Sequence, residues 1–173
     1  MSGLVKDVNA LMRDVPDFPK PGIVFKDITP ILSDAATFKR IIDWMASEVE
    51  GDVDVIVGME SRGFIFGTPL VDKLNAGFVP ARKPGKLPYD AIGVDYALEY
   101  GTARLEVHVD AIKPGQRVLV VDDLLATGGT AAATVELVEK LGGVVVACIF
   151  LVELDFLNGR EKVNAPVKAL IHY

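Results

Sequence analysis

The chain is poor in the residues that most often carry redox, metal or nucleic-acid chemistry. It has one cysteine, two histidines and a net charge of −6. Cys148 cannot form an intramolecular disulfide, and its place inside the apolar run 144–152 predicts a buried structural thiol rather than a nucleophile. His108 and His172 have no cysteine or glutamate at metal-ligand spacing, so no zinc site is predicted. The negative charge argues against nonspecific binding of nucleic acid.

Long apolar runs are also missing. No stretch approaches the roughly 18 uninterrupted apolar residues of a membrane span. Residues 1–7 have neither the apolar centre of a secretory signal nor the arginine-rich character of a transit peptide. We therefore expect a cytoplasmic protein with no membrane partner. The 173 residues, 50% of them hydrophobic, contain no repeat or linker, which predicts a single domain over 1–173.

Strand and helix patterns alternate along the chain and predict an α/β fold. Continuous apolar strands are typical of a central, mostly parallel sheet that is flanked by helices and buried on both faces. Residues 91–110 instead alternate with a period of two on both sides of a polar turn, which predicts an antiparallel hairpin. Prolines rule out regular helix through residues 16–30. The predicted strands are 53–57, 78–81, 118–121 and 144–152, and the predicted helices are 2–14, 34–51, 64–74 and 130–141.

The strongest functional signal is the string VLVVDDLLATGGT at residues 118–130. A buried strand is expected to end at Asp122 and Asp123, and a loop of small residues then leads to Thr130, where a helix begins. Loop amides and a helix start suit a phosphate, and carboxylates suit hydroxyls or a hydrated cation. A Walker A lysine is absent, and no Gly-x-Gly-x-x-Gly directly follows the strand. The string therefore predicts a site for a phosphate joined to a polyol.

Two further polar segments follow predicted strands. In residues 58–63, Arg62 at a helix start would suit a second anion, although it could equally be a surface residue of a capped helix. Residues 82–88 place three cations in a proline-punctuated loop, which alone would more often be a solvated charge run. Because ligands bind beyond the carboxyl ends of parallel strands, both segments should meet residues 122–130 there. Together they predict a clamp for a diphosphate.

These motifs resemble the type I phosphoribosyltransferase family. Residues 121–130 match its motif for phosphoribosyl diphosphate (PRPP), and other segments are similar to its adenine-specific members. The resemblance implies the type I phosphoribosyltransferase fold, with an N-terminal hood at about 1–33 and a β-hairpin lid at about 91–110. It also implies purine salvage: transfer of 5-phosphoribosyl from PRPP to N9 of adenine, which yields AMP and pyrophosphate. The adenine-type segments are 18–27, 61–64, 82–88, 98–101, 152–154 and 159–162.

The resemblance also implies a role for each matching residue. The 5-phosphate would be bound by Ala126, Thr127, Gly128, Gly129 and Thr130, and the ribose hydroxyls by Asp122 and Asp123. Pyrophosphate would be bound by Glu60, Ser61, Arg62, Arg82, Lys83 and Lys86, and adenine by Val24, Phe25, Lys26 and Leu154. The catalytic residues would be Glu99, Tyr100 and Arg62, with Glu99 handling the adenine proton.

The same resemblance implies Mg²⁺ as cofactor, held mainly by PRPP rather than by protein ligands, and a homodimer. It further implies a cis peptide bond before Ser61. Lys26 stands where relatives commonly carry arginine, which puts a bidentate contact there in doubt. Two alternatives are a xanthine- or hypoxanthine-type phosphoribosyltransferase and a PRPP-sensing regulator without catalysis. The second would need a DNA-binding module and a basic face, which this acidic chain does not offer.

Overall fold

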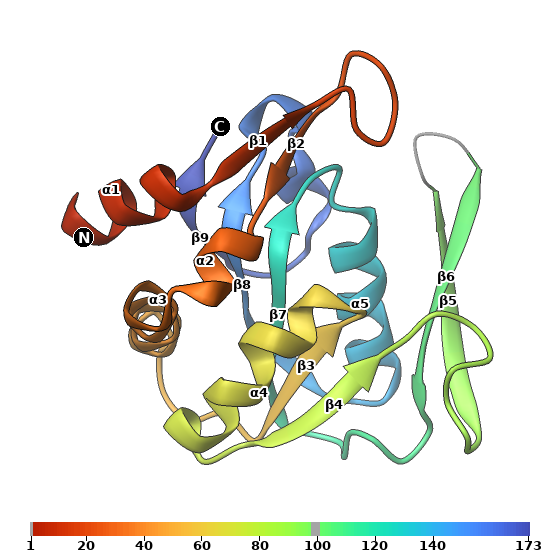
Figure 1. Cartoon of the computed structure of the whole chain (residues 1–173). Coiled ribbons are helices and arrows are strands. Elements are labelled where there is room, and N and C mark those ends of the chain that lie inside the picture. The colour runs from red at the N-terminus through yellow and green to blue at the C-terminus, as the bar shows by residue number, and fades with distance from the viewer. Residues whose placement is uncertain (1, 98–100) are drawn as a thin grey trace. The chain divides into compact units, whose positions relative to one another are not determined.

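The structure is a computed structural model that describes residues 2–97 and 101–173 (Figure 1). The chain divides into two compact units, Met1–Trp44 and Met45–Tyr173, which are described separately here. Within the described residues, none of the helices has the length and apolarity needed to cross a membrane.

The first unit contains a two-stranded antiparallel ladder between short helices. The predicted helix 2–14 ends at Leu11, because the chain becomes extended at Arg13 to pair with a second strand. Pro30 lies in the first turn of a helix, where proline is tolerated, so the prediction that excluded helix up to residue 30 was wrong at its end. Asp34 caps the next helix by accepting the N–H of Thr37 at 2.8 Å. The elements are α1 (Ser2–Leu11), β1 (Arg13–Pro16), β2 (Val24–Asp27), α2 (Thr29–Ser33) and α3 (Ala35–Ser47), which continues into the second unit.

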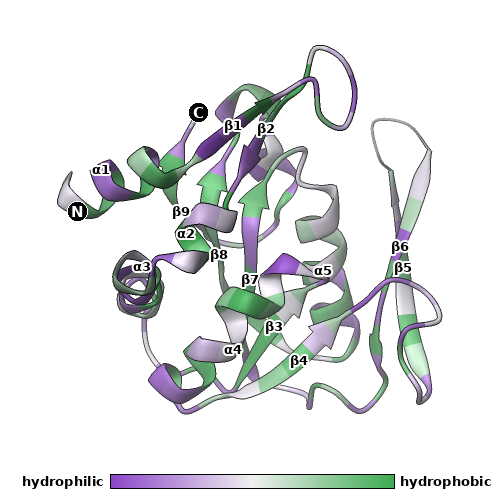
Figure 2. Ribbon diagram, in the orientation of Figure 1, coloured by the Kyte–Doolittle hydropathy of each residue, from purple (hydrophilic) through white to green (hydrophobic). Residues whose placement is uncertain are grey.

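A five-stranded parallel sheet forms the centre of the second unit. Its order is β4-β3-β7-β8-β9, and every neighbouring pair is parallel, which confirms the predicted sheet. The central strands are largely hydrophobic (Figure 2). The last strand was not predicted. The strands are β3 (Val55–Met59), β4 (Gly77–Ala81), β7 (Arg117–Leu125), β8 (Val144–Glu153) and β9 (Val167–His172), and the helices are α4 (Arg62–Leu74) and α5 (Gly129–Lys140).

Helices cover both faces of this sheet because alternate strand residues point to opposite sides. Val57 and Val120 are fully buried on the face that packs against α5 and the hairpin. On the other face α4 approaches closely, since a Cβ on Gly67 would lie 3.4 Å from the side chain of Ile56. Cys148 is fully buried in the sheet, and burial raises the pKa of its thiol to about 12, as expected for a structural cysteine.

The predicted hairpin is present and forms a separate antiparallel sheet. It consists of β5 (Ala91–Ala97) and β6 (Thr102–His108), paired from Ala91 opposite His108 to Ala97 opposite Thr102. The hairpin contacts α5 on the side away from α4 (Figure 1). It also joins the end of β4 through a two-way backbone bridge between Arg82 and Glu106.

Candidate active site

The acidic pair lies within β7 rather than after it. The sequence predicted that the strand ends at Val121, but parallel pairing with β8 continues to Leu125 opposite Glu153. The apolar side chains of Leu124 and Leu125 explain this continuation, because Leu125 is buried in the core beneath the loop. The carboxylates of Asp122 and Asp123 are therefore held by a rigid sheet strand.

The loop after β7 forms one wall of a small cavity. Gly128 adopts a positive φ of 79° and precedes α5, which begins at Gly129. The first N–H groups of a helix have no partner within it, so they are available to an anion at this end of α5. The cavity has a volume of about 80 Å³. It is lined by Met59, Asp122, Leu124, Leu125, Ala126, Thr127, Gly128, Gly129, Thr130, Ala131 and Phe150.

A second, polar cavity of about 300 Å³ brings together the three segments that the sequence predicted to converge. Gly63 allows this approach: a Cβ there would lie 2.5 Å from the carbonyl oxygen of Val121, so only glycine lets the first turn of α4 pack this closely against β7. Asp122 lines this cavity as well as the first one. The phosphate loop and the cationic segments thus share one carboxylate. The lining residues are Glu60, Ser61, Arg62, Lys83, Asp122 and Asp123.

Glu60 connects the loop after β3 to the loop after β4. Its carboxylate accepts the backbone N–H of Lys83 at 2.8 Å and the Nη2 group of Arg82 at 3.1 Å. These donors hold the pKa of Glu60 below its ordinary value. The guanidinium of Arg82 also donates to the carbonyl oxygen of Lys86 and lies over the Phe64 ring. Arg62 and Lys83 line the polar cavity, whereas Arg82 and Lys86 line neither cavity. The Glu60–Ser61 peptide bond is cis, as the resemblance implied.

Arg62 and Asp123, which both line the polar cavity, form an ion pair with each other. The Nε of Arg62 lies 2.6 Å from Oδ2 of Asp123, which is buried, while the arginine side chain is 44% exposed. Asp122 accepts the backbone N–H of Asp123 at 2.9 Å. Burial raises the pKa of Asp122 well above its ordinary value, the adjacent charge of Asp123 raises it further, and Arg62 acts in the opposite direction. The sequence had placed Arg62 and Asp123 on different parts of the substrate and did not predict their pairing.

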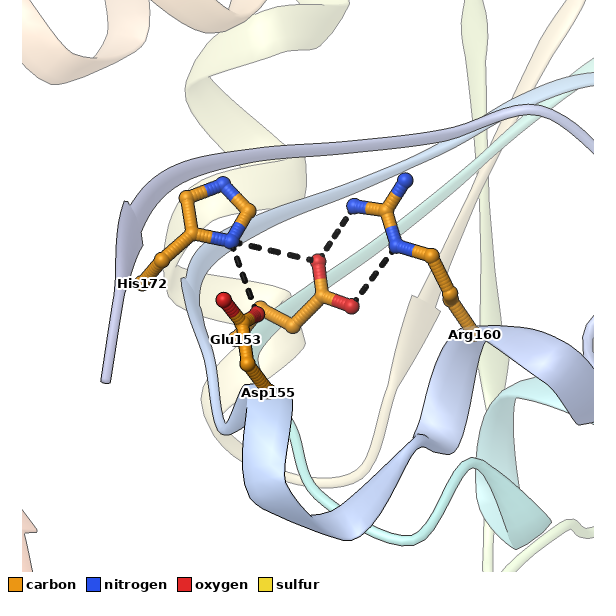
Figure 3. A network of polar contacts seen from close by, with 4 residues as sticks. All are labelled: Glu153, Asp155, Arg160 and His172. Atoms are coloured by element: carbon orange, nitrogen blue, oxygen red, sulfur yellow. Dashed lines mark hydrogen bonds and ion pairs between the residues drawn. The ribbon is translucent and has the colours of Figure 1, made fainter.

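Sequence reasoning also missed a polar network at the ends of β8 and β9 (Figure 3). Arg160 binds both carboxylate oxygens of the buried Glu153, through Nε at 2.8 Å and Nη2 at 2.5 Å. Nδ1 of His172 lies 2.9 Å from Asp155 and 3.7 Å from Glu153. Glu153, Asp155 and His172 are close enough to hold a metal ion, but Arg160 already neutralises Glu153. The network is better explained as an ion-pair anchor.

This anchor is joined to the phosphate loop through Gly159. A Cβ on Gly128 would lie 2.1 Å from the carbonyl oxygen of Gly159, and a Cβ on Gly159 would lie 2.1 Å from that of Ala126. The two backbones therefore touch without any side chain between them. Because Arg160 follows Gly159 directly, its pairing with Glu153 fixes the segment that supports the loop.

The structure does not test the roles of the remaining predicted residues. Val24, Phe25 and Lys26 belong to the first unit, where Lys26 pairs with Asp14 at 2.7 Å. Leu154 belongs to the second unit and donates its N–H to Leu125. Glu99 and Tyr100 fall outside the described residues. Their roles stay predictions.

Comparison with known proteins identifies close relatives. A family model described as "Phosphoribosyl transferase domain" matches residues 27–172. The chain is 57% identical over 170 residues to adenine phosphoribosyltransferase of Acetivibrio thermocellus, covering 96% of this chain and 99% of the relative. Crystal structures of the adenine phosphoribosyltransferases of Thermoanaerobacter pseudethanolicus (52% identity, TM-score 0.94) and Saccharomyces cerevisiae (42%, 0.91) are also similar; each match covers 98% of this chain and 99% of that one. The yeast structure holds adenine and an imino-altritol bisphosphate.

Proposed function

The chain belongs to the type I phosphoribosyltransferase family, in its adenine phosphoribosyltransferase branch, and we propose how the residues at the carboxyl edge of its sheet perform the reaction. The enzyme acts in purine salvage: it transfers the 5-phosphoribosyl group of PRPP to N9 of adenine and releases AMP and pyrophosphate. Neither the xanthine- or hypoxanthine-type enzyme nor the noncatalytic sensor is supported by these relatives.

The observation that supports the residue assignment is the position of Asp122 between the two cavities. In our proposal the phosphate loop binds the 5-phosphate through the amides of residues 126–129 and the hydroxyl of Thr130. The carboxylates of Asp122 and Asp123 accept hydrogen bonds from the ribose hydroxyls. The diphosphate then lies in the polar cavity, on the side opposite the loop. This order of groups matches the order in which PRPP carries them.

The cations of the polar cavity bind the departing diphosphate. We assign direct contacts to Ser61, Arg62 and Lys83, which line the cavity. Glu60, Arg82 and Lys86 complete this group; the first two hold the loops together through their ion pair. Loss of pyrophosphate leaves a ribose with oxocarbenium character, so positive groups must stabilise the leaving group while carboxylates stabilise the sugar. When Arg62 turns toward a phosphate oxygen, the charge of Asp123 becomes available to that ribose.

The donor set of the polar cavity fits Mg²⁺. It offers the carboxylate oxygens of Asp122 and Asp123, the ligand type that magnesium prefers. Because the carboxylate of Asp123 is paired with Arg62, the protein offers few free oxygen ligands to the metal ion. We therefore propose that Mg²⁺ is held mainly by PRPP. Bound in this way, Mg²⁺ would neutralise the oxygens of the leaving diphosphate.

For adenine we propose a site made by Val24, Phe25, Lys26 and Leu154, with Glu99 and Tyr100 brought over it by the hairpin. Adenine is itself a nucleophile, so this site mainly has to place N9 within reach of the anomeric carbon. Glu99 would handle the proton that adenine loses. The support for these roles is the match of residues 18–27, 98–101 and 152–154 to the adenine-specific members of the family.

Replacing Asp122 by asparagine is expected to stabilise the protein at neutral pH while weakening PRPP. Because folding raises the pKa of Asp122, the native state loses stability as the pH rises through that pKa and the buried carboxyl ionises. Asparagine never ionises, so the variant should gain about 1–2 kcal/mol in unfolding free energy at about pH 8. The gain should vanish below about pH 4, where unfolded aspartate is protonated too. Urea unfolding across this pH range measures it.

Asp123→Asn is the matched control for this prediction. It relieves the repulsion between the two carboxylates but also breaks the ion pair with Arg62, so no net stabilisation is expected at about pH 8. Both variants should raise KM for PRPP more than KM for adenine, because both carboxylates are assigned to the ribose. An equal gain in stability in Asp123→Asn would contradict the attribution of that gain to Asp122. Unchanged PRPP kinetics in both variants would contradict the assignment of the two carboxylates to the ribose.

The function is tested by supplying adenine, hypoxanthine, guanine and xanthine separately with PRPP and Mg²⁺. AMP and pyrophosphate should form from adenine, and product from the other bases should be far slower. Removal of the metal with EDTA should abolish turnover, and added Mg²⁺ should restore it. We also propose a cytoplasmic homodimer that binds no nucleic acid and no membrane. Absence of AMP, or turnover in the presence of excess EDTA, would overturn the corresponding part of the proposal.

A further inference from the structure

Tyr96 lies at the end of β5, directly against the start of α5. A Cβ on Gly129 would be 3.1 Å from Cδ2 of Tyr96 and 3.1 Å from the carbonyl oxygen of Ala97, so the ring and the strand backbone cover this glycine. The Tyr96 ring is partly buried and packs against the core of the second unit. The hairpin and α5 are in contact over this region (Figure 1). The Tyr96 ring of the hairpin therefore packs directly against Gly129 of the phosphate loop.

The hydroxyl of Tyr96 reaches the residue that ends this loop. Thr130 donates its hydroxyl to the Tyr96 oxygen at 3.3 Å. A second threonine, Thr134, uses the backbone oxygen of Thr130 and does not compete for its side chain. Every hydroxyl can both donate and accept. When Thr130 gives its proton to a phosphate oxygen, Tyr96 can reverse direction and donate to Oγ1 of Thr130.

From this geometry we propose that Tyr96 is a positioning residue for the 5-phosphate of PRPP, acting through Thr130. The chain of hydrogen bonds runs from Tyr96 to Thr130 to the phosphate, and the ring holds Gly129 in place behind it. The inference rests on the proposed role of the phosphate loop. It does not extend to the diphosphate, because Tyr96 does not line the polar cavity. Tyr96 does not line the phosphate-loop cavity either, so it acts on the 5-phosphate through Thr130 rather than by direct contact.

Tyr96→Phe tests this proposal because it keeps the ring and deletes only the hydroxyl. KM for PRPP should rise about three- to tenfold, the loss expected for one hydrogen bond, with KM for adenine unchanged. Ribose 5-phosphate isolates the site further, since it carries the 5-phosphate without a diphosphate. Its inhibition constant against PRPP should rise by the same factor, whereas that of pyrophosphate should stay constant.

Two further variants serve as the control for Tyr96→Phe and as the test of its coupling to Thr130. Tyr89→Phe is the matched control: Tyr89 is exposed, stacks edge-on against His108 at the opposite end of the hairpin, and should leave all constants unchanged. Thr130→Val removes the hydroxyl through which Tyr96 is proposed to act. Adding Tyr96→Phe to Thr130→Val should therefore cost nothing more in PRPP affinity.

The outcomes separate the inference from the proposed function. If Thr130→Val weakens ribose 5-phosphate but Tyr96→Phe does not, or if the two losses add in full, the positioning role is wrong and the loop assignment stands. If Thr130→Val leaves ribose 5-phosphate binding intact, the loop assignment itself fails. Equal rises in both substrate KM values together with a lowered Tm in Tyr96→Phe would show a merely structural role and would also overturn the inference.

Discussion

Replacing Gly128 by alanine should raise KM for PRPP at least about a hundredfold. The φ of Gly128 is 79°, a region that disfavours any Cβ, and the new atom would lie 2.1 Å from the carbonyl oxygen of Gly159. Backbone cannot move aside as a flexible side chain can, so the loop itself must shift. A displacement of about 1 Å in a group that positions a substrate can cost a hundredfold in activity. The effect should fall on PRPP and on ribose 5-phosphate, with KM for adenine much less affected.

Gly115→Ala is the control for this substitution. Gly115 has nearly the same φ, 82°, but nothing lies within 4 Å of its ideal Cβ. The control therefore carries the conformational strain, about 1–2 kcal/mol, without the collision. It should lower the unfolding free energy by that amount and leave both KM values unchanged. If the two variants lose PRPP affinity to the same extent, the contact with Gly159 does not support the loop.

Local sequence signals were sufficient for most of the fold. Buried parallel strands read as continuous apolar runs, and the hairpin reads as alternation, so β3, β7, β8 and the pair β5–β6 were predicted within a few residues. The strand β9 was missed because Val167–His172 lies at the sheet edge and is only partly apolar. What makes it a strand is its pairing with β8, a contact that no local pattern records. The true end of β7 was missed for the same reason.

In the candidate site, too, features that are continuous in sequence were predicted and contacts between distant segments were not. The string 118–130 and the cationic loops were recognisable because each is continuous in sequence, and the rule for parallel sheets brought them together. Pairings between segments were not recognisable: Arg62 with Asp123, and Glu153 with Arg160. The packing of Gly128 on Gly159 was equally hidden, since glycine has no side chain to signal a contact. One sequence signal could have indicated the pair of Glu153 with Arg160: Glu153 is a charged residue at the end of an apolar strand, where it needs a partner.

Replacing Arg160 by methionine should destabilise the protein strongly, because it removes the cation that pairs with Glu153. In Arg160→Met a carboxylate whose side chain is 3% exposed loses a bidentate partner and keeps His172 at 3.7 Å. Breaking a buried pair costs about 3–5 kcal/mol. Because Arg160 is itself 48% exposed, we expect a smaller loss of about 2–3 kcal/mol in unfolding free energy, just below that range. Denaturant unfolding at neutral pH measures the loss.

The comparison with Lys140→Met shows whether burial of the acid is the cause. Lys140 is 50% exposed, as Arg160 nearly is, but its partner Glu136 is 52% exposed, so losing this pair should cost no more than about 0.5 kcal/mol. Adding Glu153→Gln to Arg160→Met removes the unpaired charge and should restore part of the stability. If the double variant is no more stable than Arg160→Met, lost packing rather than the stranded carboxylate explains the effect. Because Gly159 supports Gly128, Arg160→Met should also raise KM for PRPP, which would tie the stability of this anchor to the binding of the 5-phosphate.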